Sequence, residues 1–410
     1  MPSYSSTIRE SADLTVEPVA DHWAVALRER KVLVGFDGFV DNIVTPVATR
    51  HGGGEAFMPV ETTREFAELI RKAGDGKNAN IELFQRLQKV GGNGPILANA
   101  LSIAGCHVRY VGALGWPSLH PVFKEFAERT EAISLAEPGA TTALEFSDGK
   151  IMLSMATSLD AVTYERILET VGQDRFRNLV RESDIVAFVD WTMVSRMTDI
   201  LTSVLERVLP RLSKTATPKF FFDLADPAKR LSNELRAVLH IISCYQNFGS
   251  VCLGLNGTEA CQVAKLLQIS AGDEASIDVL AREIRRSLKL DVVLVHVKGG
   301  AACADASGAK MLPSPRCSRP VVKTGAGDHF NAGYIVGQLL GLEPQKCLPL
   351  AIASPSLYLR SGSSPTLDEL KSVFSDENLE SLTNAFPQKA APNLIGDRGL
   401  SSQPNHSSQL

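Results

Sequence analysis

Short apolar runs alternate with amphipathic stretches along most of the chain. The run KVLVGF at residues 31–36 is continuous rather than alternating, which is typical of a strand buried on both faces of a sheet. Similar runs follow in DIVAFVDW, KFFFDLAD, SVCLGLN and VVLVHVKG, and helical stretches such as 197–209 and 276–288 separate most of them. This order predicts an α/β fold with a doubly wound, mostly parallel sheet and helices on both faces.

Two segments interrupt the regular order. Residues 42–90 contain glycine-rich breaks on either side of a helical stretch, and residues 140–157 alternate like two short strands around a turn at 147–149. We expect these two segments to form a small β-rich lid beside the main sheet.

The ends of the chain differ in composition from its centre. We expect a main domain over residues 31–370, preceded by an N-terminal extension at 1–30. Residues 371–410 become rich in Ser, Asn, Pro and Gln, which predicts a C-terminal extension that is partly disordered.

The composition narrows the classes of function. Of the 410 residues, 44% are apolar and 21% are charged, as in ordinary globular proteins, and the formal net charge is −4. This charge gives no basic field for nucleic acid, no apolar run reaches the roughly 18 residues that span a bilayer, and the N-terminus lacks a secretion signal. We therefore expect a cytoplasmic protein that acts on a small molecule, without nucleic-acid or membrane partners. The seven cysteines form no CxxC pair, which favours reduced thiols over disulfides or a zinc site.

The most informative motif is TGAGDHFNAG, followed by the helical pattern YIVGQLLGL. It places Gly325, Ala326 and Gly327 at a helix N-terminus, where backbone N–H groups lack intrahelical partners and attract anions. Asp328, at the end of this loop, is positioned to accept the proton of an attacking hydroxyl. The structural alternative is a glycine-rich loop that ends in an ordinary first-turn Asp.

This stretch resembles the second signature of the ribokinase (PfkB) carbohydrate kinase family, DTxGAGDxFxxG, from Thr324 to Gly333. The resemblance implies an enzyme that uses ATP and Mg²⁺ to phosphorylate a hydroxyl of a sugar or sugar derivative. It implies that Asp328 is the catalytic base, that Gly325 to Gly327 form the anion hole, and that Thr324 lies beside the nucleotide. Other segments fit the family in the same order, so the resemblance covers about residues 31–370. The chain has no GxxxxGK[ST] sequence, which excludes a P-loop.

The same resemblance assigns two segments to the substrate. In VLVGFDGFVDNIV, Asp41 corresponds best to the family acid that binds sugar hydroxyls, and Asp37 lies close by. Gly91, Gly92 and Asn93 resemble the start of the GGxGxN motif, whose glycines let the backbone approach the sugar and whose polar side chain hydrogen-bonds to it. From the residues alone, the acids also fit solvated or helix-capping carboxylates, and the glycines fit a turn before a helix.

Two further segments are assigned to Mg²⁺ and the nucleotide. Asn256 and Glu259 resemble the family NxxE motif, which holds Mg²⁺ through water, and the same pair also fits a helix capping box. Lys298 and Gly299 stand near the position of a family nucleotide contact, at a shifted register. Val322 stands where the family signature begins with Asp, a residue that helps to bind a monovalent cation, so we expect weak dependence on K⁺.

Three other functions are alternatives to this interpretation. A nucleoside kinase of the same fold remains open, because the lid side chains that discriminate substrates cannot be aligned. A sugar- or nucleotide-binding pseudokinase is disfavoured by the presence of Asp328, Asn256 and Glu259. An oxidoreductase is disfavoured because no GxGxxG follows the first strand. The resemblance also implies a lid that closes over the sugar to exclude water, with an exposed sheet face through which a homodimer can form.

Overall fold

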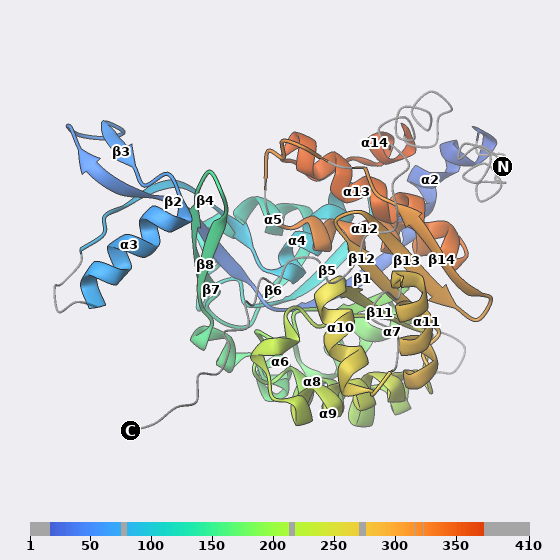
Figure 1. Cartoon of the computed structure of the whole chain (residues 1–410). Helices are drawn as coiled ribbons and strands as arrows, with labels where there is room; N and C mark the ends of the chain where they lie inside the picture. Colours follow the sequence, from blue (N-terminus) through green and yellow to red (C-terminus); the bar gives the residue numbers. More distant parts are fainter. Residues whose placement is uncertain are drawn as a thin grey trace, which may run out of the picture.

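A nine-stranded sheet forms the centre of the molecule (Figure 1). In the computed structural model, which describes residues 17–74, 80–212, 218–269, 276–315, 317–322 and 324–372, the fold class expected from the sequence is confirmed. The strands run in the order β14 (Gly308–Pro313), β13 (Gly300–Asp305), β12 (Val292–Val297), β11 (Val251–Asn256), β10 (Lys219–Asp223), β9 (Ile185–Phe188), β1 (Lys31–Phe36), β5 (His107–Gly112) and β6 (Glu131–Ser134). All neighbours pair in parallel except β12 with β13 and β13 with β14.

Helices cover both faces of this sheet. Successive side chains of a strand point to opposite faces, so one strand contributes to two hydrophobic clusters. Phe221 packs into one hydrophobic cluster, whereas Phe220 and Phe222 pack into the other. The cluster around Phe221 includes side chains of α2 (Glu17–Glu29), α4 (Asn93–Ile103), α5 (Lys124–Arg129), α12 (Ala326–Leu339), α13 (Leu348–Ser361) and α14 (Leu367–Ser372). The other includes side chains of α6 (Tyr164–Val171), α7 (Gln173–Arg181), α8 (Met197–Ser203), α9 (Ser232–Tyr245), α10 (Gly257–Leu266) and α11 (Ile277–Leu288).

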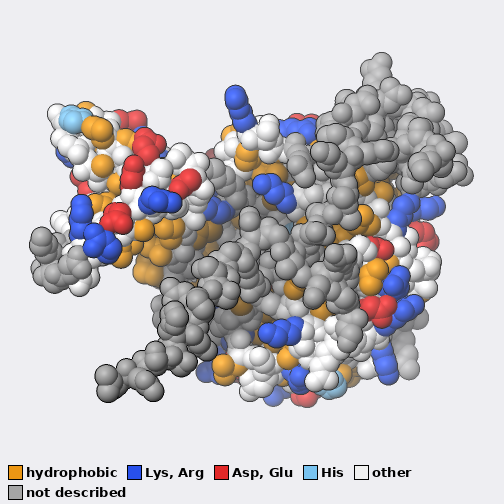
Figure 2. All heavy atoms as spheres, in the orientation of Figure 1, with side chains coloured by type: hydrophobic (Ala, Val, Ile, Leu, Met, Phe, Trp, Pro, Cys, Tyr) orange, Lys and Arg blue, Asp and Glu red, His pale blue; other side chains and the backbone are white. Residues whose placement is uncertain are grey.

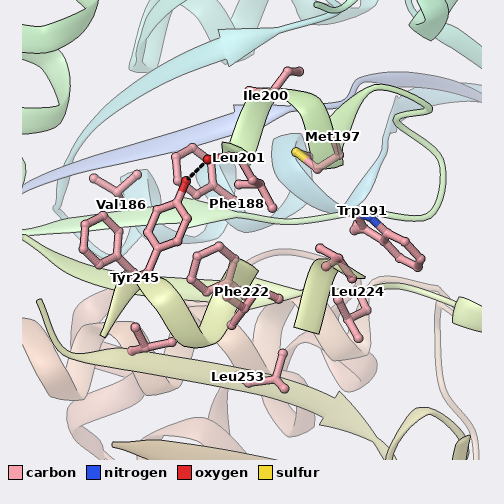
Figure 3. Close-up of a cluster of buried hydrophobic side chains, with 14 of the residues drawn as sticks. Val186, Phe188, Trp191, Met197, Ile200, Leu201, Phe222, Leu224, Tyr245 and Leu253 are labelled. Carbon is pink, nitrogen blue, oxygen red and sulfur yellow. Dashed lines mark hydrogen bonds between the residues drawn. The ribbon is translucent and has the colours of Figure 1, made fainter. Parts of the chain in front are cut away.

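Figure 3 shows part of the second cluster, where aromatic rings fill the space between the sheet and α8 and α9. The ring of Tyr245 lies edge-on to Phe222, with ring centroids 5.1 Å apart. Its buried hydroxyl donates a hydrogen bond of 2.8 Å to the carbonyl of Leu201, so the polar atom has a partner inside the core (Figure 3).

Short helical turns complete the connections. They are η1 (Pro121–Phe123), η2 (Thr157–Ala161), η3 (Val204–Val208), η4 (Leu209–Arg211), η5 (Pro227–Lys229) and η6 (Pro344–Cys347). In the part of the chain that the structure describes, no helix is both long and apolar enough to cross a membrane.

The first described helix belongs to the packed core. Trp23 and Leu27 of α2 are buried against the main domain, so residues 17–29 pack as part of the folded structure. The C-terminal extension expected to be partly disordered begins in α14, and its residues 373–410 lie outside the described residues.

A second, five-stranded sheet projects from the main domain, at the left of Figure 1. It contains β2 (Phe39–Arg50), β3 (Phe57–Pro59), β4 (Leu83–Gly91), β7 (Gly139–Glu145) and β8 (Lys150–Met155). Helix α3 (Thr63–Gly74) covers one face, where Phe66 packs with Val44 and Leu144. Both segments expected in the lid contribute strands to this sheet. Since β2 begins three residues after the end of β1, the chain passes directly from the main sheet into the lid.

Candidate active site

A cavity of about 460 Å³ is lined by residues of the lid, of loops after the main-sheet strands, and of the N-termini of α4 and α12. Eight of the residues predicted from sequence line it: Asp41, Gly92, Asn93, Thr324, Gly325, Ala326, Gly327 and Asp328. The other predicted residues are all within the described ranges and lie outside its lining: Asp37, Gly91, Asn256, Glu259, Lys298 and Gly299. The structure therefore brings the helix motif and part of the substrate motifs to one cavity.

The N-terminus of α12 forms one wall of this cavity. Gly325 caps the helix with φ of 85°, a left-handed conformation that favours glycine, and Ala326 is its first helical residue. The N–H groups of the first helical turn have no carbonyl one turn earlier to which they can donate. They therefore give this wall a positive electrostatic potential.

Asp328 lies in this first turn and is 8% exposed. Burial raises the pKa of its carboxyl well above the ordinary value, and the negative charges of Asp223, Asp37 and Asp190 raise this pKa further. A carboxyl in such surroundings is a strong proton acceptor once it is ionised.

Asp41 comes from lid strand β2 and is 5% exposed. Burial raises the pKa of its carboxyl, while Lys89, a hydrogen bond with Thr141, and Lys150 favour the ionised form. The ammonium of Lys89 also lies 3.4 Å from the Thr324 hydroxyl, which links the lid to the residue that precedes the helix cap. The charged side chains of the lid thus surround a carboxylate that lines the cavity.

Asp37 is fully buried, and its position explains why glycines stand at positions 92 and 94. Its Oδ1 accepts a hydrogen bond of 2.9 Å from the Gly94 N–H. A Cβ atom on Gly92 would lie 2.5 Å from Oδ2 of Asp37, and one on Gly94 would lie 2.4 Å from its Oδ1. Gly92 also has φ of 92°. These glycines are therefore required by the close approach of the backbone to a buried carboxylate.

Asp37 and Asp190 form a buried acid pair. Their carboxyl groups lie close enough for each to affect the pKa of the other. Burial raises the pKa of Asp37 to about 7, and it raises the pKa of Asp190 well above the ordinary value. Two neighbouring buried carboxyls favour a state in which one of them is protonated, between the end of β1 and the loop after β9.

Replacing Asp37 with Asn is expected to remove a loss of stability that occurs as pH rises from about 4 to about 7. The pKa of about 7 in the folded protein exceeds the unfolded value of 3.8, so the folded state binds more protons between these values. The stability from this group is fully present below pH 3.8 and is lost as pH rises through 7. The Asn side chain still accepts from Gly94 but cannot ionise. The melting temperature of the wild type should therefore fall more between pH 4 and pH 8 than that of Asp37→Asn. The exposed Asp199→Asn variant is the control, and equal slopes for all three proteins would contradict the raised pKa of Asp37.

Asn256 and Glu259 form the capping box at the start of α10. Asn256 N–H and Nδ2 donate to the Glu259 carboxylate at 2.8 and 2.6 Å, and Glu259 N–H donates to Asn256 Oδ1 at 3.0 Å. The pKa of Glu259 is raised to about 9, mainly by burial and also by the negative charges of Asp223 and Asp226. A divalent cation near these acids would offset their mutual repulsion, and their oxygen donors suit Mg²⁺. Among the described residues, no three His, Cys, Asp or Glu side chains converge to hold a metal by themselves.

The predicted nucleotide contact lies on another turn. Lys298 and Gly299 connect β12 to β13, with Lys298 exposed, and the Gly299 carbonyl accepts a hydrogen bond of 3.1 Å from the Ser314 N–H. The structure does not bring this turn to the cavity lining.

Several lining residues were not assigned from the sequence. Alternate residues of β8 and the loop after β9 contribute Lys150, Met152, Ser154, Asp190, Thr192 and Met193. Two signals could have found them. Side chains at every second position of the predicted hairpin share one face, and residues that follow parallel strands collect at the carboxyl edge of the sheet.

Comparisons with known proteins indicate the family to which the chain belongs. The family model for prokaryotic ketohexokinase matches residues 10–377. A ketohexokinase from Haloferax volcanii is 29% identical over 376 residues, which are 89% of this chain and 97% of that protein. A carbohydrate kinase structure from Agrobacterium tumefaciens has a TM-score of 0.56 at 18% identity, covering 88% of this chain and 98% of that one. Arabidopsis thaliana ribokinase complexed with ribose and ATP has a TM-score of 0.57 at 17% identity, covering 84% of this chain and 99% of that one.

The two structural relatives share the ribokinase fold with this chain, as the sheet topology indicates. The family model covers most of the sequence, including the lid and the α12 motif. The chain therefore belongs to the prokaryotic ketohexokinase family and is a carbohydrate kinase of the ribokinase (PfkB) type.

Proposed function

We propose that this protein transfers the γ-phosphate of ATP to a hydroxyl of a ketohexose, with Asp328 as the base and Mg²⁺ as the metal. The observation that carries the proposal is the single cavity that Asp41 and Asn93 line together with Gly325 and Asp328. One part of this cavity offers hydrogen-bonding groups for sugar hydroxyls, and another offers an anion-binding helix end beside a buried carboxyl. The name of the related Haloferax volcanii protein supports a ketohexose as the acceptor.

The proposed reaction uses the α12 N-terminus in two ways. Asp328 accepts the proton of the sugar hydroxyl as its oxygen forms a bond to the γ-phosphorus, and the bond to the ADP oxygen breaks. The N–H groups of Ala326 and Gly327 stabilise the charge on the transferring phosphoryl group. Closure of the lid over the cavity would exclude water, which otherwise competes for the phosphate.

Mg²⁺ would be held through water by Asn256 and Glu259, near Asp223 and Asp226. When bound, it neutralises phosphate charge and lowers the pKa of nearby carboxyls. Asp328 would then be ionised at the start of the reaction despite its burial. We propose that Thr324, Lys298 and Gly299 contact the nucleotide.

A substrate panel tests the proposed reaction. Purified protein is incubated with MgATP and with ketohexoses, aldohexoses, sugar phosphates, sugar acids and nucleosides in turn, and ADP release and the phosphorylated product are measured. We expect turnover to be fastest with a ketohexose. Faster turnover of a nucleoside would favour the nucleoside kinase alternative, and binding without any turnover would favour a pseudokinase.

Replacing Glu259 with Gln is expected to raise the Mg²⁺ concentration for half-maximal rate more than it raises KM for the sugar. The amide keeps the size and part of the capping interaction but loses the charge that attracts the hydrated ion. A Mg²⁺ titration at saturating ATP and sugar measures the shift. Glu234, which forms a similar cap at the start of α9 outside the cavity, provides the matched control as Glu234→Gln. An unchanged titration in Glu259→Gln would leave Glu259 with its capping role alone.

We propose that the lid also mediates a homodimer. Its strands expose several large apolar side chains outside the cavity lining: Leu83, Leu87, Leu153 and Met155. Figure 2 shows hydrophobic side chains gathered between α3 and the β7–β8 hairpin. Light scattering coupled to size-exclusion chromatography should give about twice the chain mass of 44.2 kDa, and Leu153→Asp combined with Met155→Asp should halve it. A wild-type mass of one chain at all concentrations would overturn the dimer.

A further inference from the structure

His329 directly follows the proposed base, Asp328, in the sequence. Its side chain points back toward the helix cap, Gly325. Its ring Nδ1 lies 2.7 Å from the carbonyl oxygen of Gly325, and its own backbone N–H donates to the same oxygen at 3.1 Å. The ring is 1% exposed and stacks on Tyr358, with centroids 3.6 Å apart and planes at 12°. The Gly325 carbonyl is therefore held by two donors from one residue.

The hydrogen bonds determine which ring nitrogen carries the proton. A carbonyl oxygen only accepts, so Nδ1 carries the hydrogen, and Nε2 accepts from the Ser364 hydroxyl at 2.9 Å. Burial lowers the pKa of this imidazole to about 4, so the ring stays neutral at ordinary pH. The Ser364 oxygen accepts in turn from Nδ2 of Asn99 at 3.2 Å. All donors in this chain point toward Gly325.

The trans peptide bond between Gly325 and Ala326 connects these hydrogen bonds to the cavity. The Gly325 carbonyl and the Ala326 N–H belong to the same planar unit and point in opposite directions. A hydrogen bond that fixes the carbonyl on the His329 side therefore fixes the Ala326 N–H on the opposite side. Both Gly325 and Ala326 line the cavity.

We propose that His329 is a positioning residue that orients the Ala326 amide of the anion hole by holding the Gly325 carbonyl. The inference rests on the proposed function, because it assumes that this amide stabilises the transferring phosphoryl group. Ser364 and Asn99 set the orientation of the ring from α4 and from the segment after α13. An amide free to rotate must be reoriented during the reaction, which raises the barrier without changing how the sugar binds.

Variants of His329 test the proposal. His329→Phe keeps an aromatic ring against Tyr358 but has no Nδ1 donor, and kcat should fall by about 10- to 100-fold while KM for the sugar changes by less than about threefold. His329→Asn places a donor near the position of Nδ1 and should recover most of kcat. Ser364→Ala removes only the support of the ring and should lower kcat by about three- to tenfold. Melting temperatures and KM for each variant separate this effect from a loss of folding.

The outcomes distinguish the inference from the proposed function. If Asp328→Asn is inactive while His329→Phe and Ser364→Ala keep the wild-type kcat, the positioning role is overturned and the base assignment stands. If His329→Phe does not fold, the kcat of His329→Asn relative to His329→Gln decides, because Gln places its donor near Nε2 instead. Equal loss in both, or a rise in KM that matches the loss of kcat, also overturns the positioning role. If Asp328→Asn retains full activity, the proposed function itself fails.

Discussion

The Asp328→Asn variant is expected to lose about 10²- to 10⁴-fold in kcat, the usual value of general-base catalysis. Asn fills the same volume in the first turn of α12 but cannot accept the hydroxyl proton. Removal of a buried acid with a raised pKa should not destabilise the fold, so the melting temperature should be equal to or higher than that of the wild type. Steady-state kinetics give kcat, and calorimetry gives the affinity for MgATP, which should change little.

The pH profile gives a second test of Asp328. Its pKa in the ligand-free protein lies well above the ordinary value, mainly because of burial. A base must be ionised to act, so kcat/KM should rise with pH through this pKa and then level off. The residual activity of Asp328→Asn should lack this acidic limb. Near-normal turnover in the variant, or an unchanged acidic limb, would rule out Asp328 as the base.

The sheet could be predicted because its strands are locally distinctive. Runs such as those in β1 and β12 are apolar at nearly every position, as burial on both faces requires, and helical periodicity separates most of them. The motif around Asp328 could be predicted for a related reason. A glycine loop, an acid and a helix follow one another within ten residues, so their spatial relation is set by local geometry.

The rest of the site depends on contacts between residues distant in sequence. The sequence assigned Asp37 and Asp41 to the sugar together, and the structure places only Asp41 on the cavity lining. Asp37 lies beneath it, paired with Asp190, which is more than 150 residues away. The sequence gives no register between the end of β1 and the loop after β9, so this pair could not be derived from it.

His329 illustrates the same limit within a motif. The pattern DTxGAGDxFxxG allows any residue at this position. Helical periodicity alone shows only that the residue belongs to α12. Its contacts to Gly325 and Ser364 depend on the rotamer of one ring and on a loop 35 residues further along the chain. Side-chain direction at a helix N-terminus and the path of a distant loop require the folded structure.

Replacing Asp41 with Ala is expected to lower kcat/KM for the sugar by about fivefold to 150-fold, with little change in ATP affinity. The carboxylate is almost completely buried at the lid side of the cavity, where a sugar hydroxyl that loses its acceptor is left unpaired. Such a loss costs about 1–3 kcal/mol, which sets the expected range. Asn93→Ala should act in the same direction, because its amide lines the same cavity. Kinetics at varied sugar and fixed saturating ATP measure both effects.

The neighbouring residue provides the matched control for Asp41. Asn42 lies next to it on β2, but its side chain points to the other face of the strand, where its Oδ1 accepts from Gln88 at 2.9 Å. Asn42→Ala should therefore leave kcat/KM within about twofold of the wild type, since it alters the lid without altering the cavity lining. If both variants lose activity equally, the lid acts through its overall stability and the Asp41 carboxylate has no specific role. If Asp41→Ala instead weakens ATP binding and leaves KM for the sugar unchanged, the sugar lies elsewhere in the cavity, and the lid carboxylate belongs to the nucleotide side.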